Sequence, residues 1–424
     1  VDFQLGKLNV VSGKSGVGKS SLVKGILLKV VRDQLGIDIE GIPKLSSHEN
    51  IDAINKLIFI DHSPIGKTPR SNPATYLGIS DYIREIYANL PESKTLGFTK
   101  SRFSFNAPNT PKTRRGGRCE TCQGAGKTQI GMHFLGNIEL VCGTCNGDRF
   151  NAETLEIKYK GKSIADCYKL SINEAITFFK DQNKVLVGLK VLQEIGLGYL
   201  RLGQSSTTLS GGEAQRIKIA NQLQKRDTGD TLYVIIEPSI GLHYDDIHSL
   251  LQLFDRIKQK GNTIVCIEQN ETIIRSSDWH IELGPITGKH GGTIAYQGLP
   301  IENLSNKMAR GAEVSLNKTS VIDDIILNGV TTHGLKNIDV RIPKNQLTVV
   351  TGVSGSGKSS LVYDTLFAES NAQFTESLSI HNRSLLQQNS EAKIASFSGL
   401  GPAISINRKG GSPSSRSTVG TLSG

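Results

Sequence analysis

Residues 6–27 read GKLNVVSGKSGVGKSSLVKGIL: an apolar β-branched run, the spacing G-x-x-x-x-G-K-S, and then a helix-like segment. Gly13 and Gly18 allow main-chain N–H groups to wrap around phosphate oxygens, and the amino end of the following helix adds positive potential. We expect Lys19 to reach the outer phosphates of a nucleoside triphosphate and Ser20 to offer its hydroxyl to Mg²⁺. The stretch therefore predicts an α/β sheet with a triphosphate site at the carboxyl end of one strand.

The same pattern returns at residues 345–366 as NQLTVVTGVSGSGKSSLVYDTL. Each copy has a strand-like run before the loop and a helix-like run after it, which disfavours the alternative of a glycine-rich turn without a nucleotide. The sequence therefore predicts two nucleotide sites, formed by Gly13, Ser15, Gly16, Gly18, Lys19, Ser20 and Ser21 in the first copy and by Gly352, Ser354, Gly355, Gly357, Lys358, Ser359 and Ser360 in the second.

The whole chain has 424 residues, 37% of them hydrophobic, with 45 glycines, which suits a loop-rich α/β protein of two to four domains. No apolar run is long enough for a membrane span, and no signal segment opens the chain, so we expect a cytoplasmic protein. Because Val1 lies so close to the first phosphate loop, we also expect a fragment of a longer protein.

The net charge of +10 suits a polyanionic partner. Seven Lys or Arg and no acid lie between residues 94 and 118, and Phe98, Phe103 and Phe105 are interleaved with them. A solvated loop is one interpretation of this segment. The aromatic residues, and the cysteine motif that follows, favour contact with nucleic acid.

Four cysteines form two C-x-x-C pairs, Cys119 with Cys122 and Cys142 with Cys145, separated by nineteen residues. This spacing is typical of a tetrahedral four-thiolate zinc site, and a closed shell of this kind is structural. Disulfides are the alternative, but they are disfavoured in a chain without an export signal. We expect the zinc to hold the intervening strands as a hairpin.

Residues 232–243 read LYVIIEPSIGLH, which predicts a buried parallel strand that delivers one acid, Glu237, to the carboxyl edge of the sheet. Nucleotide hydrolases usually place two acids there, one for the metal and one for the attacking water. The residue before Glu237 is Ile236, which cannot bind a metal. The strand therefore raises the question of whether this site still hydrolyses its nucleotide.

The stretch TTLSGGEAQRIKIANQL at 207–223 resembles the signature of ABC-type ATPases, in which Leu209–Glu213 form the core. Further motifs are SPIGKTPRSNPATY (63–76), SRFSFN (101–106), GGRCETCQG (116–124), THGLKNIDVRIP (332–343) and SGSGKSSLVYDTLFAES (354–370). They narrow the resemblance to the UvrA family, which recognises damage in bacterial nucleotide excision repair. Residues 1 to about 300 resemble the carboxyl-terminal half of UvrA, and residues 328–424 resemble the start of its amino-terminal half.

The resemblance implies an ABC-type nucleotide domain with an inserted, zinc-bearing signature domain, followed by the start of a second nucleotide domain. The order of the halves suggests the central slice of a tandem, double-length UvrA, although a rearranged gene would look the same. The implied domains are a first part of the nucleotide domain at 1–62, the insertion at 63–200, a second part at 201–302, a linker at 303–327 and the truncated second domain at 328–424.

By the same resemblance, Ser210, Gly211 and Gly212 would cap the γ-phosphate held by the phosphate loop of another nucleotide domain. In this chain, that loop could be the one that contains Lys358. The family binds distorted duplex DNA as a homodimer, in an ATP-dependent way, and loads the helicase subunit UvrB. Such binding depends on DNA deformability rather than on base sequence. For the DNA contacts we expect Lys67, Arg70, Lys100 and Arg102.

Three positions depart from the family pattern around the first nucleotide. Ile236 replaces the acid that orders the Mg²⁺ shell, Gln269 replaces the switch histidine, and His62 replaces the glutamine of the Q-loop, whose counterpart in the second copy is Arg408. Glu237, which would polarise the attacking water, is retained. We therefore expect the first site to bind ATP and Mg²⁺ but to hydrolyse ATP poorly.

Two other functions remain open at this stage. UvrA-like proteins also protect cells against DNA-binding drugs, and the fold would be the same. A non-enzymatic scaffold that binds DNA or partner subunits is favoured by Ile236 and Gln269, and opposed by Glu237, the complete signature and the second phosphate loop.

Overall fold

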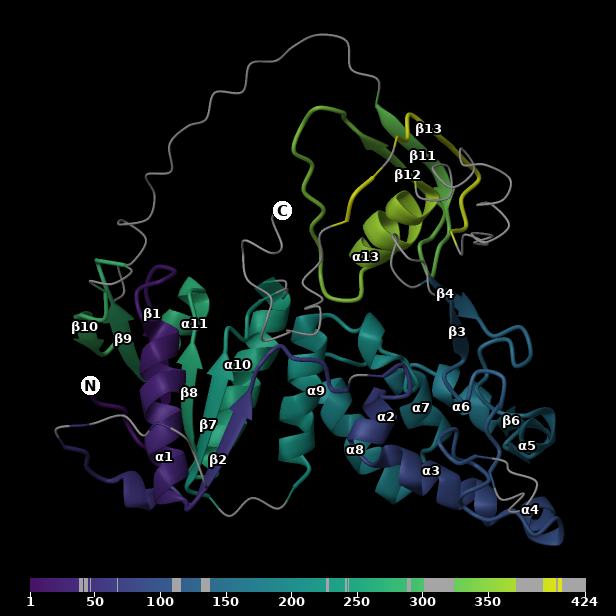
Figure 1. Ribbon diagram of the computed structural model, residues 1–424, viewed down its shortest axis with the longest axis horizontal. Helices are drawn as coiled ribbons and strands as arrows, with labels where there is room; N and C mark the ends of the chain where they lie inside the picture. The colour runs from purple at the N-terminus through teal and green to yellow at the C-terminus, as the bar shows by residue number, and fades with distance from the viewer. Residues whose placement is uncertain are drawn as a thin grey trace. The chain divides into compact units, whose positions relative to one another are not determined.

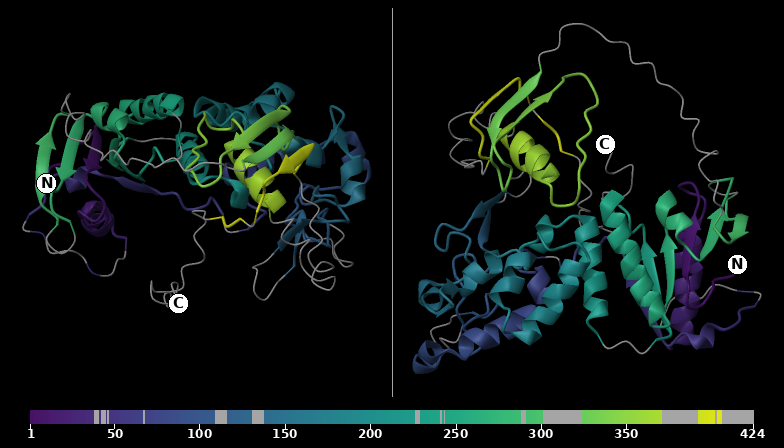
Figure 2. Two further views of the ribbon diagram at one scale, coloured as in Figure 1. Left: turned by 90° about the horizontal axis from the view of Figure 1, so that it is seen from above. Right: turned by 180° about the vertical axis from the view of Figure 1, so that it is seen from behind.

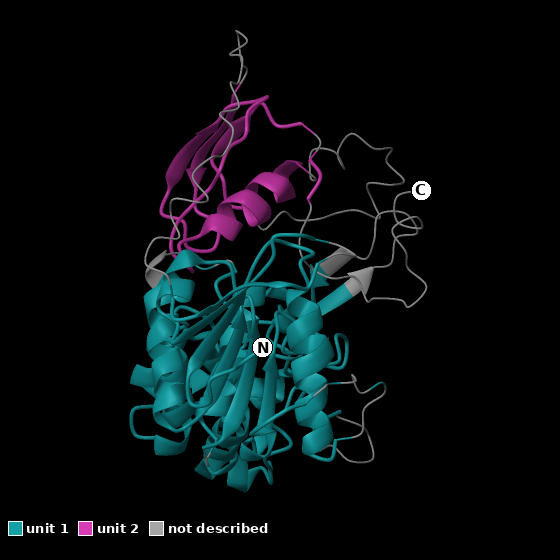
Figure 3. Cartoon of the chain, turned by 90° about the vertical axis from the view of Figure 1, so that its left-hand side faces the viewer, with its two compact units in different colours: residues 1–313 teal, residues 314–424 magenta. Residues whose placement is uncertain are grey.

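A computed structural model shows two compact units, residues 1–313 and residues 314–424 (Figure 3). Lys67, Arg408 and most of the expected linker lie outside the described residues. The described residues are 1–37, 41, 45, 47–66, 68–108, 116–130, 138–225, 229–240, 242, 244–287, 291–300, 324–370, 392–401 and 403–405.

The first unit is built on a six-stranded sheet in the order β10-β9-β1-β8-β7-β2 (Figure 1). All neighbours are parallel except β10, which runs antiparallel to β9. Because both faces are covered, β1, β7 and β8 are buried along their whole lengths, which explains their runs of Val and Ile. The strands are β1 (Leu8–Ser12), β2 (Lys56–Ile60), β7 (Thr231–Ile236), β8 (Thr263–Ile267), β9 (Trp279–Leu283) and β10 (Ile294–Gly298).

Helices cover the two faces of this sheet, with α1 on one side and α10 on the other (Figure 2). Alternate residues of β7 face opposite sides of the sheet. Val234 and Ile236 belong to the apolar cluster that includes residues of η1 and α1, whereas Tyr233 and Ile235 belong to the cluster that includes residues of α10. These helices are η1 (Ser21–Leu27), α1 (Leu28–Gln34), η2 (Ile51–Ala53), α10 (Tyr244–Gln259) and α11 (Glu271–Arg275).

Strands β2 and β7 are neighbours in the sheet, with Lys56 opposite Thr231, yet the chain between them builds a large helical insertion (Figure 1). The insertion contains the hairpin β3 (Lys127–Ile130) with β4 (Ile138–Val141) and the hairpin β5 (Lys158–Tyr159) with β6 (Lys162–Ser163). Its helices are α2 (Pro73–Tyr76), α3 (Ile79–Ala88), α4 (Pro91–Thr95), α5 (Ala152–Glu156), α6 (Ile164–Lys169), α7 (Ile172–Phe178), α8 (Asn183–Glu194), η3 (Ser206–Thr208) and α9 (Gly211–Leu223).

Aromatic side chains form much of the insertion's core. Phe103 is fully buried with its ring 5.6 Å from that of Tyr87, and Phe105 packs edge-on against Phe150 at 5.9 Å. The interpretation of Phe103 and Phe105 as nucleic-acid contacts is therefore wrong, because both rings are committed to the core. None of the helices in the described part of the chain is long and apolar enough to cross a membrane.

The second unit contains a three-stranded antiparallel sheet in the order β12-β11-β13, around a small core that includes Leu327, Val330 and Leu361. After its phosphate loop come α13 (Lys358–Leu361) and η5 (Val362–Phe367). The strands are β11 (Ile325–Val330), β12 (Ile338–Ile342) and β13 (Ser396–Ser398).

The strand expected before the second phosphate loop does not form. Leu347 is 89% exposed and Val349 is 71% exposed, whereas their counterparts Leu8 and Val10 are buried in β1. Strand β1 is hydrogen-bonded on one side to β8 and on the other to β9. No such parallel neighbours exist in the described part of the second unit, so the same apolar pattern has no ladder to join.

Candidate nucleotide and metal sites

The two phosphate loops have the same backbone conformation. Three glycines in each loop adopt positive φ angles, a conformation that side chains disfavour. The first glycine also has no room for a side chain, because a Cβ on Gly13 would lie 2.3 Å from the oxygen of Leu283. The φ angles are 132°, 77° and 106° at Gly13, Gly16 and Gly18, and 149°, 78° and 97° at Gly352, Gly355 and Gly357.

The lysine of each loop folds back over the loop. Lys19 Nζ donates to the oxygens of Gly13 and Lys14 at 2.5 and 2.7 Å, and Lys358 Nζ donates to those of Gly352 and Val353 at 2.6 and 2.8 Å. An ammonium held by carbonyl oxygens can exchange them for phosphate oxygens at little cost in hydrogen bonding. The repeat is therefore preserved in three dimensions at the two predicted phosphate sites.

Glu237 lies where the sequence placed it, directly after β7 at the carboxyl edge of the sheet. Its N–H donates to Ile267 O at 2.7 Å, and its φ of 47° is unusual for a non-glycine residue. Burial lowers the pKa of Lys19, and the negative charge of Glu237 opposes that shift. The negative charge of Glu237 thus acts on the lysine of the phosphate loop.

Ile236 is 8% exposed and packs in the apolar cluster that includes Val17 of the phosphate loop and Val23 of the helix after it. Its main-chain oxygen accepts a hydrogen bond from Gln215 Nε2 at 2.8 Å. An apolar, buried side chain therefore occupies the position directly before Glu237.

Glu268, which follows β8, is a functional candidate that the sequence reasoning missed. The residue is 3% exposed, and its carboxylate accepts hydrogen bonds from the main-chain N–H groups of Ser239 at 3.0 Å, Gln269 at 2.6 Å and Asn270 at 3.0 Å. One buried charge thus holds together the loop after Glu237 and the loop of Gln269. The available signal was an acid at the end of a second buried parallel strand, directly before the expected switch residue.

The signature segment begins helix α9. Ser210 is its N-cap, and Ser210 and Glu213 form a reciprocal capping box. Glu213 is also fixed by the hydroxyl of Tyr199 at 2.7 Å. Ser210 and Gly211 are exposed, so the amino end of α9 lies at the surface.

His62 lies against the start of this helix, because a Cβ on Gly211 would be 3.5 Å from its Nδ1. Both ring nitrogens of His62 are buried and have no hydrogen-bond partner among the described residues. Gln269, by contrast, is exposed on the loop after β8. The structure therefore brings His62 to the signature, while Glu237 lies near Lys19.

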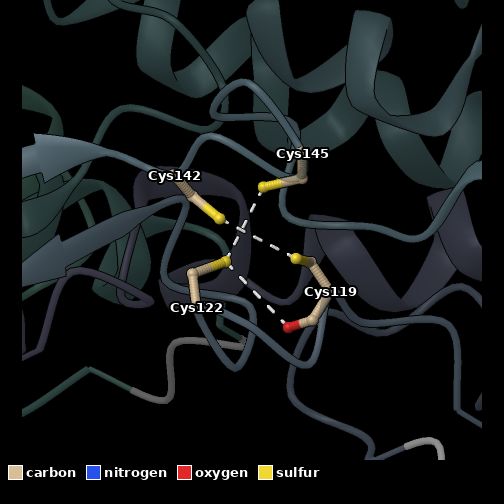
Figure 4. A group of neighbouring side chains, drawn as sticks. All are labelled: Cys119, Cys122, Cys142 and Cys145. Carbon is tan, nitrogen blue, oxygen red and sulfur yellow. Dashed lines mark hydrogen bonds between the residues drawn. The ribbon is translucent and has the colours of Figure 1, made fainter.

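The four cysteines converge into one buried cluster, with their sulfurs within 4.8 Å of one another (Figure 4). Cys119 Sγ lies 3.9 Å from Cys142 Sγ, and Cys122 Sγ lies 3.7 Å from Cys145 Sγ. A tetrahedron with Zn–S bonds of about 2.3 Å has sulfur–sulfur edges of about 3.8 Å. The donor set fits zinc, which would crosslink the ends of the β3–β4 hairpin and supply no open coordination position.

The thiols need a cation in order to ionise together. Burial raises the pKa of Cys145 to about 12. Burial also opposes ionisation of Cys142, but main-chain N–H groups of Cys145 and Thr144 lower its pKa to about 7. A bound divalent cation would stabilise all four residues as thiolates, so Cys119, Cys122, Cys142 and Cys145 are the residues that would hold it.

Three comparisons place this geometry among known proteins. No protein-family model matches the chain. UvrABC system protein A of Staphylococcus epidermidis is 48% identical over 307 residues, which is 72% of this chain and 32% of that protein. The Aquifex aeolicus protein of the same name is 46% identical over 306 residues, with the same two shares. The crystal structure of UvrA2 from Deinococcus radiodurans matches at 42% identity with a TM-score of 0.65, over 71% of this chain and 35% of that one.

The chain belongs to the UvrA family. It spans about a third of the length of these relatives. The resemblance read from the motifs is confirmed, as is an α/β nucleotide fold that carries a four-cysteine cluster compatible with zinc.

The UvrA resemblance also led us to expect four DNA-contacting residues, and those that the structure describes differ in their exposure to solvent. Lys100 is exposed and Arg70 is partly exposed, whereas Lys67 lies outside the described residues. Arg102 is 3% exposed, contacts Glu153 and Thr154, and stacks on Phe98 at 4.4 Å. The prediction for Arg102 is wrong, because its guanidinium is used to hold the insertion together.

Proposed function

We propose that this chain is part of a UvrA-type damage sensor of nucleotide excision repair, which binds distorted duplex DNA in an ATP-dependent way and loads a UvrB-type helicase subunit as a homodimer. One chain combines a formed phosphate loop, a capped signature helix and a cluster of four cysteines, and it is 48% identical to UvrABC system protein A over 307 residues. This combination is the observation that carries the proposal. The net charge of +10 suits the polyanionic partner.

The first phosphate loop binds ATP in this proposal but hydrolyses it slowly. The cradle of glycine N–H groups and Lys19 is formed, and Ser20 is exposed to offer a hydroxyl to Mg²⁺. The position before Glu237 is filled by the apolar side chain of Ile236. Glu268 does not replace the missing acid in this arrangement, because its carboxylate already accepts three main-chain N–H groups. Binding depends on the cradle, whereas turnover also depends on an ordered metal shell.

The test is to restore the missing acid. Ile236→Asp should raise ATP turnover at least about tenfold, and it should do so only when Glu237 is intact. The background variant Lys358→Ala removes hydrolysis at the second loop, and Ile236→Leu is the control for repacking. Fluorescent-nucleotide binding that is lost in Lys19→Ala but kept in Ile236→Asp would assign the effect to catalysis. Fast turnover by the Lys358→Ala protein, abolished by Glu237→Gln, would refute the slow first site.

DNA binding is tested with duplexes that carry a bulky adduct, compared with intact duplexes at several salt concentrations. Lys100→Ala should weaken binding to all duplexes and reduce the slope of log K against log salt by roughly one. Arg102→Ala is the informative contrast, since it should lower stability and leave the salt slope of the folded protein unchanged. Equal affinity for damaged and intact duplexes would remove the damage-sensing part of the proposal.

A non-cycling scaffold is the second candidate, and Ile236 favours it. DNA binding measured with ATP and with a non-hydrolysable analogue distinguishes the two functions. A damage sensor releases or redistributes on DNA when ATP is replaced by a non-hydrolysable analogue, whereas a scaffold binds DNA equally with either nucleotide.

A further inference from the structure

Arg149 stands out beside the cysteine cluster, because both its main chain and its side chain serve neighbouring groups. Its N–H donates to Cys145, and its oxygen accepts the N–H of Cys119 at 2.8 Å. Its φ is 70°, in the left-handed region that side chains disfavour and that glycine adopts readily. A backbone role alone would be met better by glycine, so the side chain must contribute something that offsets this strain.

The guanidinium is enclosed on several sides. It lies 5.3 Å from the ring centroid of Phe105, packs against Gly126, and interacts electrostatically with Cys122 and Cys145. In the described part of the chain, no carboxylate forms an ion pair with it. A largely buried cation without an acidic partner is costly, unless another negative charge lies nearby.

The cysteine cluster supplies that charge when it holds a divalent metal. Four thiolates around one divalent cation carry a net charge of −2, in a site whose sulfurs are all buried. Arg149 is therefore placed to neutralise part of that charge, in the way that outer-shell groups stabilise metal–thiolate centres.

The same side chain also reaches away from the cluster. Arg149 Nη2 donates to the main-chain oxygen of Gly203 at 3.2 Å. Gly203 begins the short segment that leads to the signature, and Ser206 of that segment is fixed by hydrogen bonds from its hydroxyl to Gly66 O at 2.9 Å and Thr68 O at 3.1 Å. One residue thus bridges the metal cluster and the segment that positions Ser210.

We propose that Arg149 is a positioning residue and counter-cation of the four-cysteine metal centre, and that it couples the state of this centre to the segment before the signature helix. The inference concerns metal binding and local order, so it does not depend on ATP turnover or on DNA binding.

The test uses the zinc-loaded 424-residue chain and three variants. Arg149→Lys keeps the charge, Arg149→Gln removes it, and Arg149→Gly removes the side chain while relieving the strained φ. Zinc affinity, measured by competition with a chromogenic chelator, should fall about 10–100-fold in the Gln and Gly variants and less in the Lys variant. The matched control is Arg118→Gln, because Arg118 also adjoins Cys119 but pairs with Glu120 at 2.9 Å; its zinc affinity should equal that of the parent.

A second measurement tests the coupling between the cysteine cluster and residues 203–210. Hydrogen exchange of residues 203–210 should speed up in Arg149→Gln, and in the parent chain after zinc removal, but not in Arg118→Gln. Equal zinc affinity in the parent and in the Gly variant would overturn the proposal, as would unchanged exchange at 203–210. Equal losses in the Lys, Gln and Gly variants would overturn the counter-cation role. If the Gln variant does not fold, the comparison of the Lys and Gly variants distinguishes the same outcomes.

Discussion

Lys218 donates hydrogen bonds to both the main-chain oxygen and the carboxylate of Asp61, at 3.0 and 2.7 Å. Asp61 directly follows β2 and precedes His62, whereas Lys218 lies about two turns into the signature helix α9. The same ammonium donates to Ser63 Oγ at 2.6 Å. The signature helix is thus fastened to the edge strand of the nucleotide sheet by one partly buried lysine.

Lys218→Met should lower the free energy of unfolding by about 1 kcal/mol and make acid unfolding begin at higher pH. Burial opposes ionisation of Asp61, but hydrogen bonds from Lys218 and Ser63 lower its pKa from 3.8 to about 2. Because the folded-state pKa is depressed, the stabilisation is complete above about pH 4 and is lost as the pH falls from there towards 2. Urea unfolding between pH 2 and 7 measures both effects.

The more exposed ion pair of Arg256 with Glu194 is the control for this prediction. Arg256→Met should leave the acid limb of the curve in place. An identical acid limb in Lys218→Met and in the parent would contradict the role of the Lys218–Asp61 pair.

Glu268→Gln should cost about 1–3 kcal/mol, although the side chain keeps its shape. The carboxylate accepts three main-chain N–H groups, and an amide NH₂ would face some of those donors. The loops of Glu237 and Gln269 should loosen together, so nucleotide turnover should fall along with stability. Denaturant unfolding and single-turnover kinetics measure the two losses.

Glu271→Gln provides the comparison, since Glu271 lies three residues further along and forms an exposed pair with Arg275. Its cost should be below about 0.5 kcal/mol. The assignment of Glu268 fails if the two glutamine variants are equally stable.

His280 should make the protein less stable in mild acid. It is fully buried, its Nε2 lies 2.7 Å from Ser12 Oγ directly before the phosphate loop, and Tyr296 packs beside it at 5.8 Å. Burial lowers the pKa of His280 below 6.5, with Glu282 opposing the shift. The unfolded chain therefore binds a proton that the folded chain resists, and stability falls as the pH drops below about 6.5.

His280→Gln keeps a hydrogen-bonding side chain without a titrating group, so its stability should change less between pH 7 and 5 than that of the parent. Ser12→Ala should lower stability at every pH and keep the parent's slope. Parallel curves for His280→Gln and the parent would show that His280 is not the group responsible.

Cys122→Ser, or removal of the metal by a chelator, should open the β3–β4 hairpin and leave the six-stranded sheet intact. A metal held by the four thiolates would crosslink the two ends of that hairpin, whereas the sheet has its own apolar core. Limited proteolysis should cut first between residues 119 and 145.

The control is Cys266→Ala, which replaces a buried cysteine of β8 and should lower the free energy of unfolding by about 1 kcal/mol without changing the zinc content. Equal zinc content in Cys122→Ser and the parent would exclude the cluster as the metal site.

Several features could be predicted from the sequence because each depends on a short stretch of backbone. The conformation of the phosphate loops depends on glycines at positive φ angles. The capping box depends on Ser210 and Glu213, and the tight turns of the cysteine cluster depend on the paired C-x-x-C motifs. Strand β7 and its terminal Glu237 could be predicted as well, because a run of buried Val and Ile is typical of a parallel strand.

Other features depended on partners distant in the sequence. The positive charge of Arg102 predicted a DNA contact, but Glu153 and Thr154 draw its side chain into the core. Glu268 could be seen in the sequence as an acid after a buried strand, but its role could not be predicted, because that role depends on N–H groups of two different loops.

By itself, the sequence determined the backbone conformation of the two phosphate loops, the capping box of α9 and the tight turns of the two C-x-x-C pairs, since each of these depends on residues within one short segment. Only the tertiary structure decided that Leu8–Ser12 is a central strand while the matching residues before Lys358 are not. The reason is that a strand makes no hydrogen bonds within itself, so it forms only where other segments of the chain supply strands for it to pair with.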